Sequence, residues 1–286
     1  MVERFRRIAV LGVGLIGGSI AAAARERGLA DRVVGFAPGH DAPEALRLGL
    51  LDAVAADAAS AVEGADLVVL AAPVPALPAL LAQIAPRLAA DAVLTDAAST
   101  KRSTIAAARE ALGAGAGRFV AAHPIAGAER HGPAAARSDL FDGCITLLCP
   151  EPDTDAQACR RVAAFWSAIG ARVVEMRAAD HDRLFAEVSH WPHAAVFALC
   201  AAIGEGAQAE DALRFAGAGL RDATRIGASS ASLWADIILD NREPVLECAA
   251  AFERELRAVL EAIERGDRAA LVERFETGSR WRRRLR

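Results

Sequence analysis

Short apolar runs alternate with longer segments of helical periodicity through the first half of the chain. The runs cover residues 8–11, 32–36, 66–72, 92–96 and 119–122. Apolar runs of this length, each followed by an amphipathic segment, predict parallel β-strands connected by helices. Because the run that ends before Pro73 is apolar on both faces, helices should cover both sides of the sheet. The pattern predicts an α/β fold with a Rossmann-type, doubly wound parallel sheet.

The pattern changes near residue 150. Residues 145–149 predict an edge strand, and Pro150-Glu151-Pro152 marks a domain boundary. One more αβ unit follows to about residue 178, and after it the periodicity is helical. We therefore predict a dinucleotide-binding domain at 1–150, with its αβ extension to about 178, and an all-helical substrate and dimerisation domain at 179–286. Helices are expected over 191–205, 230–240, 244–265 and 267–284. Such helices cannot bury their apolar faces alone, which favours a homodimer.

The first apolar run leads into a glycine-rich turn, Gly12-Val13-Gly14-Leu15-Ile16-Gly17, and a helical pattern follows. In this strand–turn–helix context the spacing favours a dinucleotide site over a turn that binds nothing. Gly12 permits the tight turn, Gly14 lets a pyrophosphate approach the backbone, and Gly17 allows close helix packing. Leu15 and Ile16 begin a helix whose unpaired N–H groups face the phosphates.

Two other strand ends complete the predicted cofactor site. Ala72 and Pro73 follow a central strand, at the edge where open α/β sheets bind ligands. Ala37 follows the strand at 32–36, where an NAD-binding fold usually has an acidic residue for the adenine ribose. No arginine signals NADP there either, so these residues leave the choice between NAD and NADP open. Asp41 could reach back to the ribose, or His40 could face a 2′-phosphate.

Composition excludes several classes of function. The 286 residues are 53% hydrophobic and 24% charged, with a net charge of −4, so no global charge favours nucleic acid, and no apolar run is long enough for a membrane. The five cysteines are scattered, without a CxxC motif, and we expect a cytoplasmic protein with free thiols. His190 and His193 could bind a metal only with one or two further ligands, for which His181 and Asp182 are the candidates. We favour substrate contact for this segment and predict no metal.

Three polar clusters carry the candidate chemistry. The first is Ser99-Thr100-Lys101 at a strand end, where Ser99 is also expected to be a helix N-cap and Lys101 is the only lysine. The second is His123-Pro124, at the end of the next strand, where a histidine beside a dinucleotide is a candidate general base. The third is 189–193, which contains His193.

These motifs resemble the prephenate/arogenate (cyclohexadienyl) dehydrogenase family of tyrosine biosynthesis. The resemblance covers nearly the whole chain in order, and its motifs lie at residues 12–19, 96–101, 123–129, 181–182, 188–194, 219–226 and 234–237. It implies oxidative decarboxylation of prephenate or arogenate with hydride transfer to NAD(P). The family majority favours NAD as the cofactor, and NADP is possible. No regulatory domain is expected after residue 286, so tyrosine feedback would have to act at the active site.

The resemblance also implies roles for individual residues. His123 would match the histidine that hydrogen-bonds the ring hydroxyl, and Ser99 the serine near that hydroxyl and the nicotinamide. His193 would match a second-domain histidine at the substrate side chain, and Arg225 the arginine that binds a substrate carboxylate. Further substrate contacts are expected from Lys101, Ala128, Glu129 and Trp234.

Two departures and two alternatives stay open. Ala128 and His131 replace small polar residues common in the family, which leaves the choice between the keto and amino substrates undecided. One alternative is a β-hydroxyacid dehydrogenase or imine reductase, although the catalytic lysine usual in the second domain of the β-hydroxyacid family is missing. The other alternative is a dinucleotide-binding module without catalytic activity.

Overall fold

A computed structural model describes residues 4–127 and 130–285. Its first half is built on one eight-stranded sheet with the order β3-β2-β1-β4-β5-β6-β7-β8. The strands are β1 (Phe5–Leu11), β2 (Ala30–Phe36), β3 (Ala53–Val54), β4 (Leu67–Leu70), β5 (Val93–Asp96), β6 (Phe119–Pro124), β7 (Ile145–Cys149) and β8 (Arg172–Glu175). The predicted parallel sheet is confirmed from β3 through β6.

Helices cover both faces of this sheet, as the apolar runs predict. Along β1, Ile8 and Val10 belong to one buried cluster, whereas Ala9 and Leu11 belong to the other. The first cluster includes residues of α1 (Leu15–Glu26), α2 (Asp41–Arg47) and α6 (Ala156–Ala168). The second includes residues of α3 (Ala58–Val62), α4 (Leu77–Ile84) and α5 (Arg102–Leu112). Strand residues alternate between the faces, so each central strand is buried on both sides.

The far edge of the sheet differs from the prediction. β7 pairs antiparallel with β6 and parallel with β8, so it lies inside the sheet and β8 forms the edge. The αβ unit after Pro150-Glu151-Pro152 thus adds a strand to the same sheet, which ends at Glu175. An edge strand could not be distinguished from an interior one because the run 145–149 is short and apolar in both cases.

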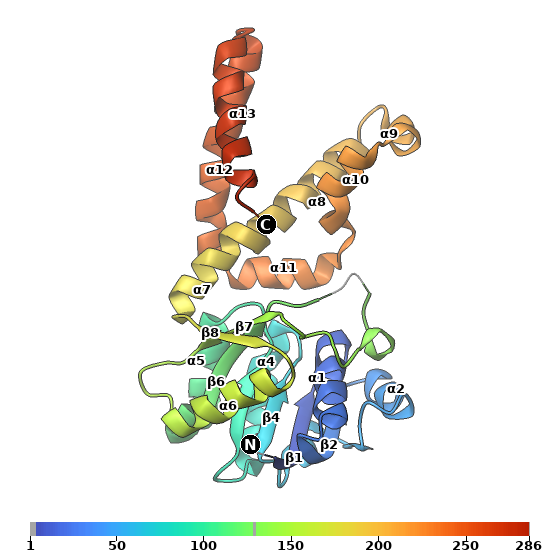
Figure 1. Ribbon diagram of the computed structural model, residues 1–286, viewed down its shortest axis with the longest axis vertical. Coiled ribbons are helices and arrows are strands. Elements are labelled where there is room, and N and C mark those ends of the chain that lie inside the picture. Colours follow the sequence, from blue (N-terminus) through green and yellow to red (C-terminus); the bar gives the residue numbers. More distant parts are fainter. Residues whose placement is uncertain (1–3, 128–129, 286) are drawn as a thin grey trace.

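The second half is helical, and its predicted helices are confirmed to within about two residues. It begins with α7 (Ala178–Phe185), a π-helical turn (Ala186–His190) and α8 (Trp191–Gly204), which follow one another directly. The remaining helices are α9 (Ala209–Phe215), α10 (Ala218–Thr224), α11 (Ala231–Asp240), α12 (Arg242–Glu264) and α13 (Arg268–Arg282). In Figure 1, α12 and α13 run side by side away from the sheet, whereas α11 lies over the edge where the strands end.

The candidate site lies at this edge of the sheet, where the parallel strands end. The glycine turn follows β1, Ala72 and Pro73 follow β4, and Ser99 and Lys101 follow β5. The parallel strands end on the same side, so these turns gather below α7 and α11.

Candidate active site

The glycine turn has the geometry that its spacing predicts. Gly12 has φ +92°, and a Cβ there would lie 2.5 Å from the carbonyl oxygen of Ala71. A Cβ on Gly17 would lie 1.8 Å from the carbonyl oxygen of Gly12. Both positions therefore require glycine for packing, not for a ligand.

Gly14 is different, because a Cβ there would meet no atom within 4 Å. It caps the N-terminus of the twelve-residue helix α1 without a side-chain hydrogen bond, and Leu15 and Ile16 form the first turn. Open space beside unpaired backbone N–H groups at a helix N-terminus suits a pyrophosphate. The residues present therefore fit a dinucleotide.

The other predicted cofactor residues flank this turn. Ala37 directly follows β2 and is half-buried, and Ala72 is half-buried behind β4. Pro73 is exposed and precedes a short 3₁₀ turn (Val74–Ala76). All three lie at the carboxyl ends of strands next to β1, which is the ligand edge of such sheets.

A buried ion pair fixes the turn after β5. Lys101 and Asp96 are both 0% exposed; the ammonium of Lys101 donates to the Asp96 carboxylate and to the carbonyl oxygen of Ala122. The other Asp96 oxygen accepts the N–H of Ala122 at 2.8 Å. This placement corrects the expected substrate contact of Lys101: its side chain joins the ends of β5 and β6 and so positions Ser99 and His123.

The N-terminus of α5 is capped from a distant part of the chain. α5 starts at Arg102, and Ser99 is not its N-cap. The carboxylate of Asp182 accepts the backbone N–H groups of Lys101 and Arg102 at 2.9 and 3.0 Å. Ser99 stays half-buried in the turn, where its hydroxyl has no partner among the described residues.

Asp182 also begins a chain of hydrogen bonds that ends at His123. Its carboxylate lies 2.8 Å from Nδ1 of His181, and Nε2 of His181 lies 2.8 Å from Nδ1 of His123. His181 is fully buried, and the ring of Phe185 stacks on it at a centroid distance of 4.5 Å. The same Phe185 ring lies 4.7 Å from His123, so both imidazoles are held in place by packing as well as by hydrogen bonds.

The charge of Asp182 determines which nitrogens carry protons along these hydrogen bonds. Burial opposes ionisation of Asp182, but hydrogen bonds from His181, Arg102 and Lys101 together lower its pKa. Its ionised carboxylate only accepts, so Nδ1 of His181 donates and Nε2 of that neutral ring accepts. His123 then donates from Nδ1, which leaves a lone pair on Nε2. Burial is the main cause that lowers the pKa of His123 well below 6.5, and the positive charge of Lys101 lowers it further, so the neutral ring is a base near pH 7.

The second half of the chain adds His193, Trp234 and Arg225 to this edge. The ring of His193 stacks on Trp234 of α11, and its Nδ1 donates to the carbonyl oxygen of Ser189 at 2.9 Å. Burial lowers the pKa of His193, and the positive charge of Arg225 lowers it further. Arg225 begins the turn Arg225–Ala228, between α10 and α11, and this turn packs against α8, the helix that contains His193.

Ala128 and Glu129 lie outside the described residues. Among the described residues, no group of three or more His, Cys, Asp or Glu side chains is arranged to hold a metal ion. No helix in residues 4–127 and 130–285 is long and apolar enough to cross a membrane. All five cysteines are free.

The sequence places His181-Asp182 within a family motif, but the pattern predicts no role for either residue at the base. The available signal for these two residues was an adjacent His and Asp near the start of a predicted helical segment. It could not show that this pair contacts both α5 and β6, because those contacts join residues 58 to 81 positions apart in the chain.

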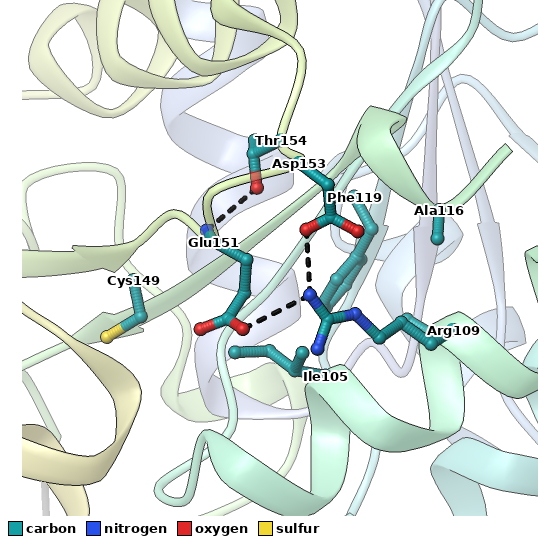
Figure 2. A pocket seen from close by; sticks show the side chains of 9 residues that line it. Ile105, Arg109, Ala116, Phe119, Cys149, Glu151, Asp153 and Thr154 are labelled. Atoms are coloured by element: carbon teal, nitrogen blue, oxygen red, sulfur yellow. Dashed lines mark hydrogen bonds and ion pairs between the residues drawn. The ribbon is translucent and has the colours of Figure 1, made fainter. Parts of the chain in front are cut away.

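A hollow beside α5 contains none of the predicted site residues. In Figure 2, Arg109 lies between Glu151 and Asp153, and its guanidinium pairs with both carboxylates. The polar groups there satisfy one another, so the histidine-lined edge remains the candidate active site.

Comparisons with known proteins agree with this geometry. Residues 20–175 match the family of the prephenate dehydrogenase nucleotide-binding domain, and residues 177–277 match that of the prephenate dehydrogenase dimerization domain. A cyclohexadienyl dehydrogenase of Zymomonas mobilis is 35% identical over 97% of this chain and 95% of its own length. A prephenate dehydrogenase of Bacillus subtilis is 32% identical over 96% of this chain and 75% of its own length.

A solved structure gives the same result. Prephenate dehydrogenase from Aquifex aeolicus, in complex with hydroxyphenyl propionate and NAD+, is 31% identical with a TM-score of 0.91. The match covers 98% of each chain. With both domains matched and relatives of this identity, the chain belongs to the prephenate dehydrogenase family.

Proposed function

We propose that this enzyme oxidises and decarboxylates prephenate, or its amino counterpart arogenate, in tyrosine biosynthesis, with hydride transfer to NAD. The observation that carries the proposal is the lone pair on Nε2 of His123, at the end of β6 and on the same edge of the sheet as the dinucleotide turn after β1. The relatives named cyclohexadienyl and prephenate dehydrogenase support the substrate class. The relative solved with hydroxyphenyl propionate and NAD+ supports the cofactor.

The proposed reaction has three steps: hydride loss, proton transfer and loss of CO₂. The ring carbon that bears the hydroxyl loses a hydride, and NAD, when bound, accepts it. Nε2 of His123 takes the hydroxyl proton as the carbonyl forms. The bond to the ring carboxylate then breaks and CO₂ leaves. The electron pair of that bond makes the ring aromatic and converts the carbonyl to a phenolate, which takes the proton back from His123.

The remaining predicted residues would bind and orient the substrate. Arg225 is the cation for a substrate carboxylate, a role that suits the planar guanidinium. Ser99 would contact the hydroxyl near the nicotinamide, and His193 with Trp234 would face the side chain. From the resemblance, Ala128 and Glu129 are also proposed to contact the substrate.

We also propose a cytoplasmic homodimer. The family of the second half is named for dimerization. On α12, Phe252, Leu256, Leu260 and Ile263 follow a spacing of four, four and three residues, so they share one face, and each is at least 45% exposed. A second copy is the expected cover for this stripe. Light scattering at micromolar concentration should give the mass of a dimer, and the mass of a monomer would contradict this proposal.

One experiment tests the proposed reaction directly. The absorbance of the reduced nicotinamide is followed while the protein is mixed with prephenate or arogenate, each with NAD or NADP. Turnover of prephenate or arogenate with NAD supports the proposal. Absence of turnover with both substrates would leave the two alternatives: a β-hydroxyacid dehydrogenase or imine reductase, and a dinucleotide-binding module without catalytic activity.

A further inference from the structure

A second histidine of the cluster, His190, is oriented by a separate branch of the same network. The side-chain nitrogen of Asn241 donates to the backbone carbonyl of Asp182 at 2.7 Å and lies 3.0 Å from Nδ1 of His190. A carbonyl oxygen can only accept, so the Asn241 atom in this position is the NH₂ nitrogen. Nδ1 of His190 must therefore accept, and Nε2 carries the proton.

That Nε2–H has no partner among the described residues, although the ring is only 1% exposed. Burial lowers the pKa of His190 to about 4, so the ring is neutral and keeps this one donor at neutral pH. Buried donors are rarely left without an acceptor in folded proteins. An unpaired donor in a candidate active site therefore indicates that a ligand atom accepts its hydrogen bond.

The ring lies between the two groups of predicted site residues. Its centroid is 6.4 Å from that of Phe185, which packs on His123, and 6.3 Å from that of Trp234, which stacks on His193. Nδ1 faces Asn241, so Nε2 points away from it.

Of the four histidines in this region, His190 alone presents a proton. Nδ1 of His123 donates to His181, and Nδ1 of His181 donates to Asp182. Nδ1 of His193 donates to the carbonyl oxygen of Ser189. Each of these three neutral rings therefore has a lone pair on Nε2. A substrate with a hydroxyl proton to lose and carboxylate oxygens to bind needs both kinds of group.

We propose that His190 is a substrate-binding residue whose Nε2–H donates to a carboxylate or carbonyl oxygen of the substrate, and that Asn241 positions it by fixing its tautomer. This inference rests on the proposed function. It assigns the cluster one base, at His123, and one neutral donor, at His190, both oriented through Asp182.

The test compares two substitutions that differ in the position of the donor. His190→Asn places an amide near the Nδ1 position but has no donor at the Nε2 position, whereas His190→Gln carries an N–H at about the Nε2 distance. We expect His190→Asn to raise KM for prephenate about tenfold to a hundredfold with a small change in kcat, because a contact made equally in ground and transition states affects binding. His190→Gln should recover most of that loss.

A matched control is Trp191→Phe, which removes another buried N–H without a partner. Trp191 contacts Phe252 and no ring of the histidine cluster in the described contacts. We expect its KM to stay within threefold of wild type. An unchanged KM in His190→Asn, or equal losses in His190→Asn and His190→Gln, would overturn the proposal.

A measurement on the unmodified protein covers the case in which His190→Asn does not fold. In nitrogen NMR of the wild type, His190 should be the Nε2–H tautomer, and this proton should shift when prephenate is added without dinucleotide. The opposite tautomer, or no shift at saturation, would also overturn the proposal. Failure of the proposed function would instead appear as absent turnover in the wild type.

Discussion

The two halves of the molecule bury their residues very differently. All residues of β4 and β5 are buried, and buried clusters flank the sheet on both sides. In contrast, α8, α9, α10 and α13 contain no residue classed as buried among those described. The nucleotide-binding half thus has its own core, whereas the helical half leaves apolar faces uncovered in a single chain.

This difference suggests that the two halves have different roles in the proposed site. The half with its own core holds the dinucleotide turn and the proposed base, His123, at strand ends. The helical half would contribute the proposed substrate-binding residues His190, His193 and Arg225. Asp182 of the helical half is one link between the two: its side chain caps α5 of the sheet half, and its carbonyl oxygen accepts from Asn241 of its own half. Substitutions in each part should therefore affect different steps.

The largest effect is expected at His123, which belongs to the sheet half. His123→Asn keeps a hydrogen-bonding group but cannot take the proton, so kcat should fall about 10²- to 10⁴-fold. Affinity for NAD and the melting temperature should stay near wild type. Steady-state kinetics with a dinucleotide titration would check this, and more than about a tenth of wild-type kcat would place the base elsewhere.

The pH profile sharpens the same prediction. Since burial lowers the pKa of His123, the neutral base should persist below pH 6.5 in the wild type. The fall in kcat on acidification should therefore begin below that value, and this limb should be absent in His123→Asn. An acid limb above pH 6.5 would contradict the assigned environment.

The next effect is expected at the residue that joins the halves. Asp182→Asn puts a donor where only acceptors fit, and it disturbs both the His181 tautomer and the cap of α5. We expect kcat to fall about ten- to a thousandfold, because orientation is lost while the base remains. The melting temperature should fall as well. Asp180→Asn in the same helix is the control, since Asp180 is exposed and pairs only with Arg183 among the described residues.

Sequence alone predicts the sheet half well and the site in part. The run–turn–helix pattern located Gly12, Gly14 and Gly17, because their roles depend on local backbone geometry. The ends of β5 and β6 likewise located Ser99 and His123. The roles of Lys101, His181 and Asn241 could not be predicted, because each depends on contacts with residues distant in the chain. Lys101 shows the limit clearly: its rarity suggested a specific task, but only the fold shows that its partner is Asp96.

A smaller effect, confined to substrate use, is expected in the helical half. A charge-assisted pair with a carboxylate contributes about 1.5–3 kcal/mol, so Arg225→Ala should lower kcat/KM roughly tenfold to over a hundredfold. Affinity for NAD should not change. Arg221→Ala, in the last turn of α10, is the matched control. A loss of thermal stability with unchanged KM would mean that Arg225 serves the fold and not the substrate.

The smallest effect concerns the cofactor and lies wholly in the sheet half. Ala37 follows β2, where an acidic side chain would hold the adenine ribose hydroxyls and repel a 2′-phosphate. Ala37 does neither, and it offers no cation to the phosphate. The preference for NAD over NADP in kcat/KM should therefore be below about a hundredfold, or roughly 2.7 kcal/mol. Ala37→Asp should increase that preference about tenfold through the added ribose contacts, with KM for prephenate unchanged. A wild-type preference for NADP above a hundredfold would show that another residue near this turn binds the phosphate.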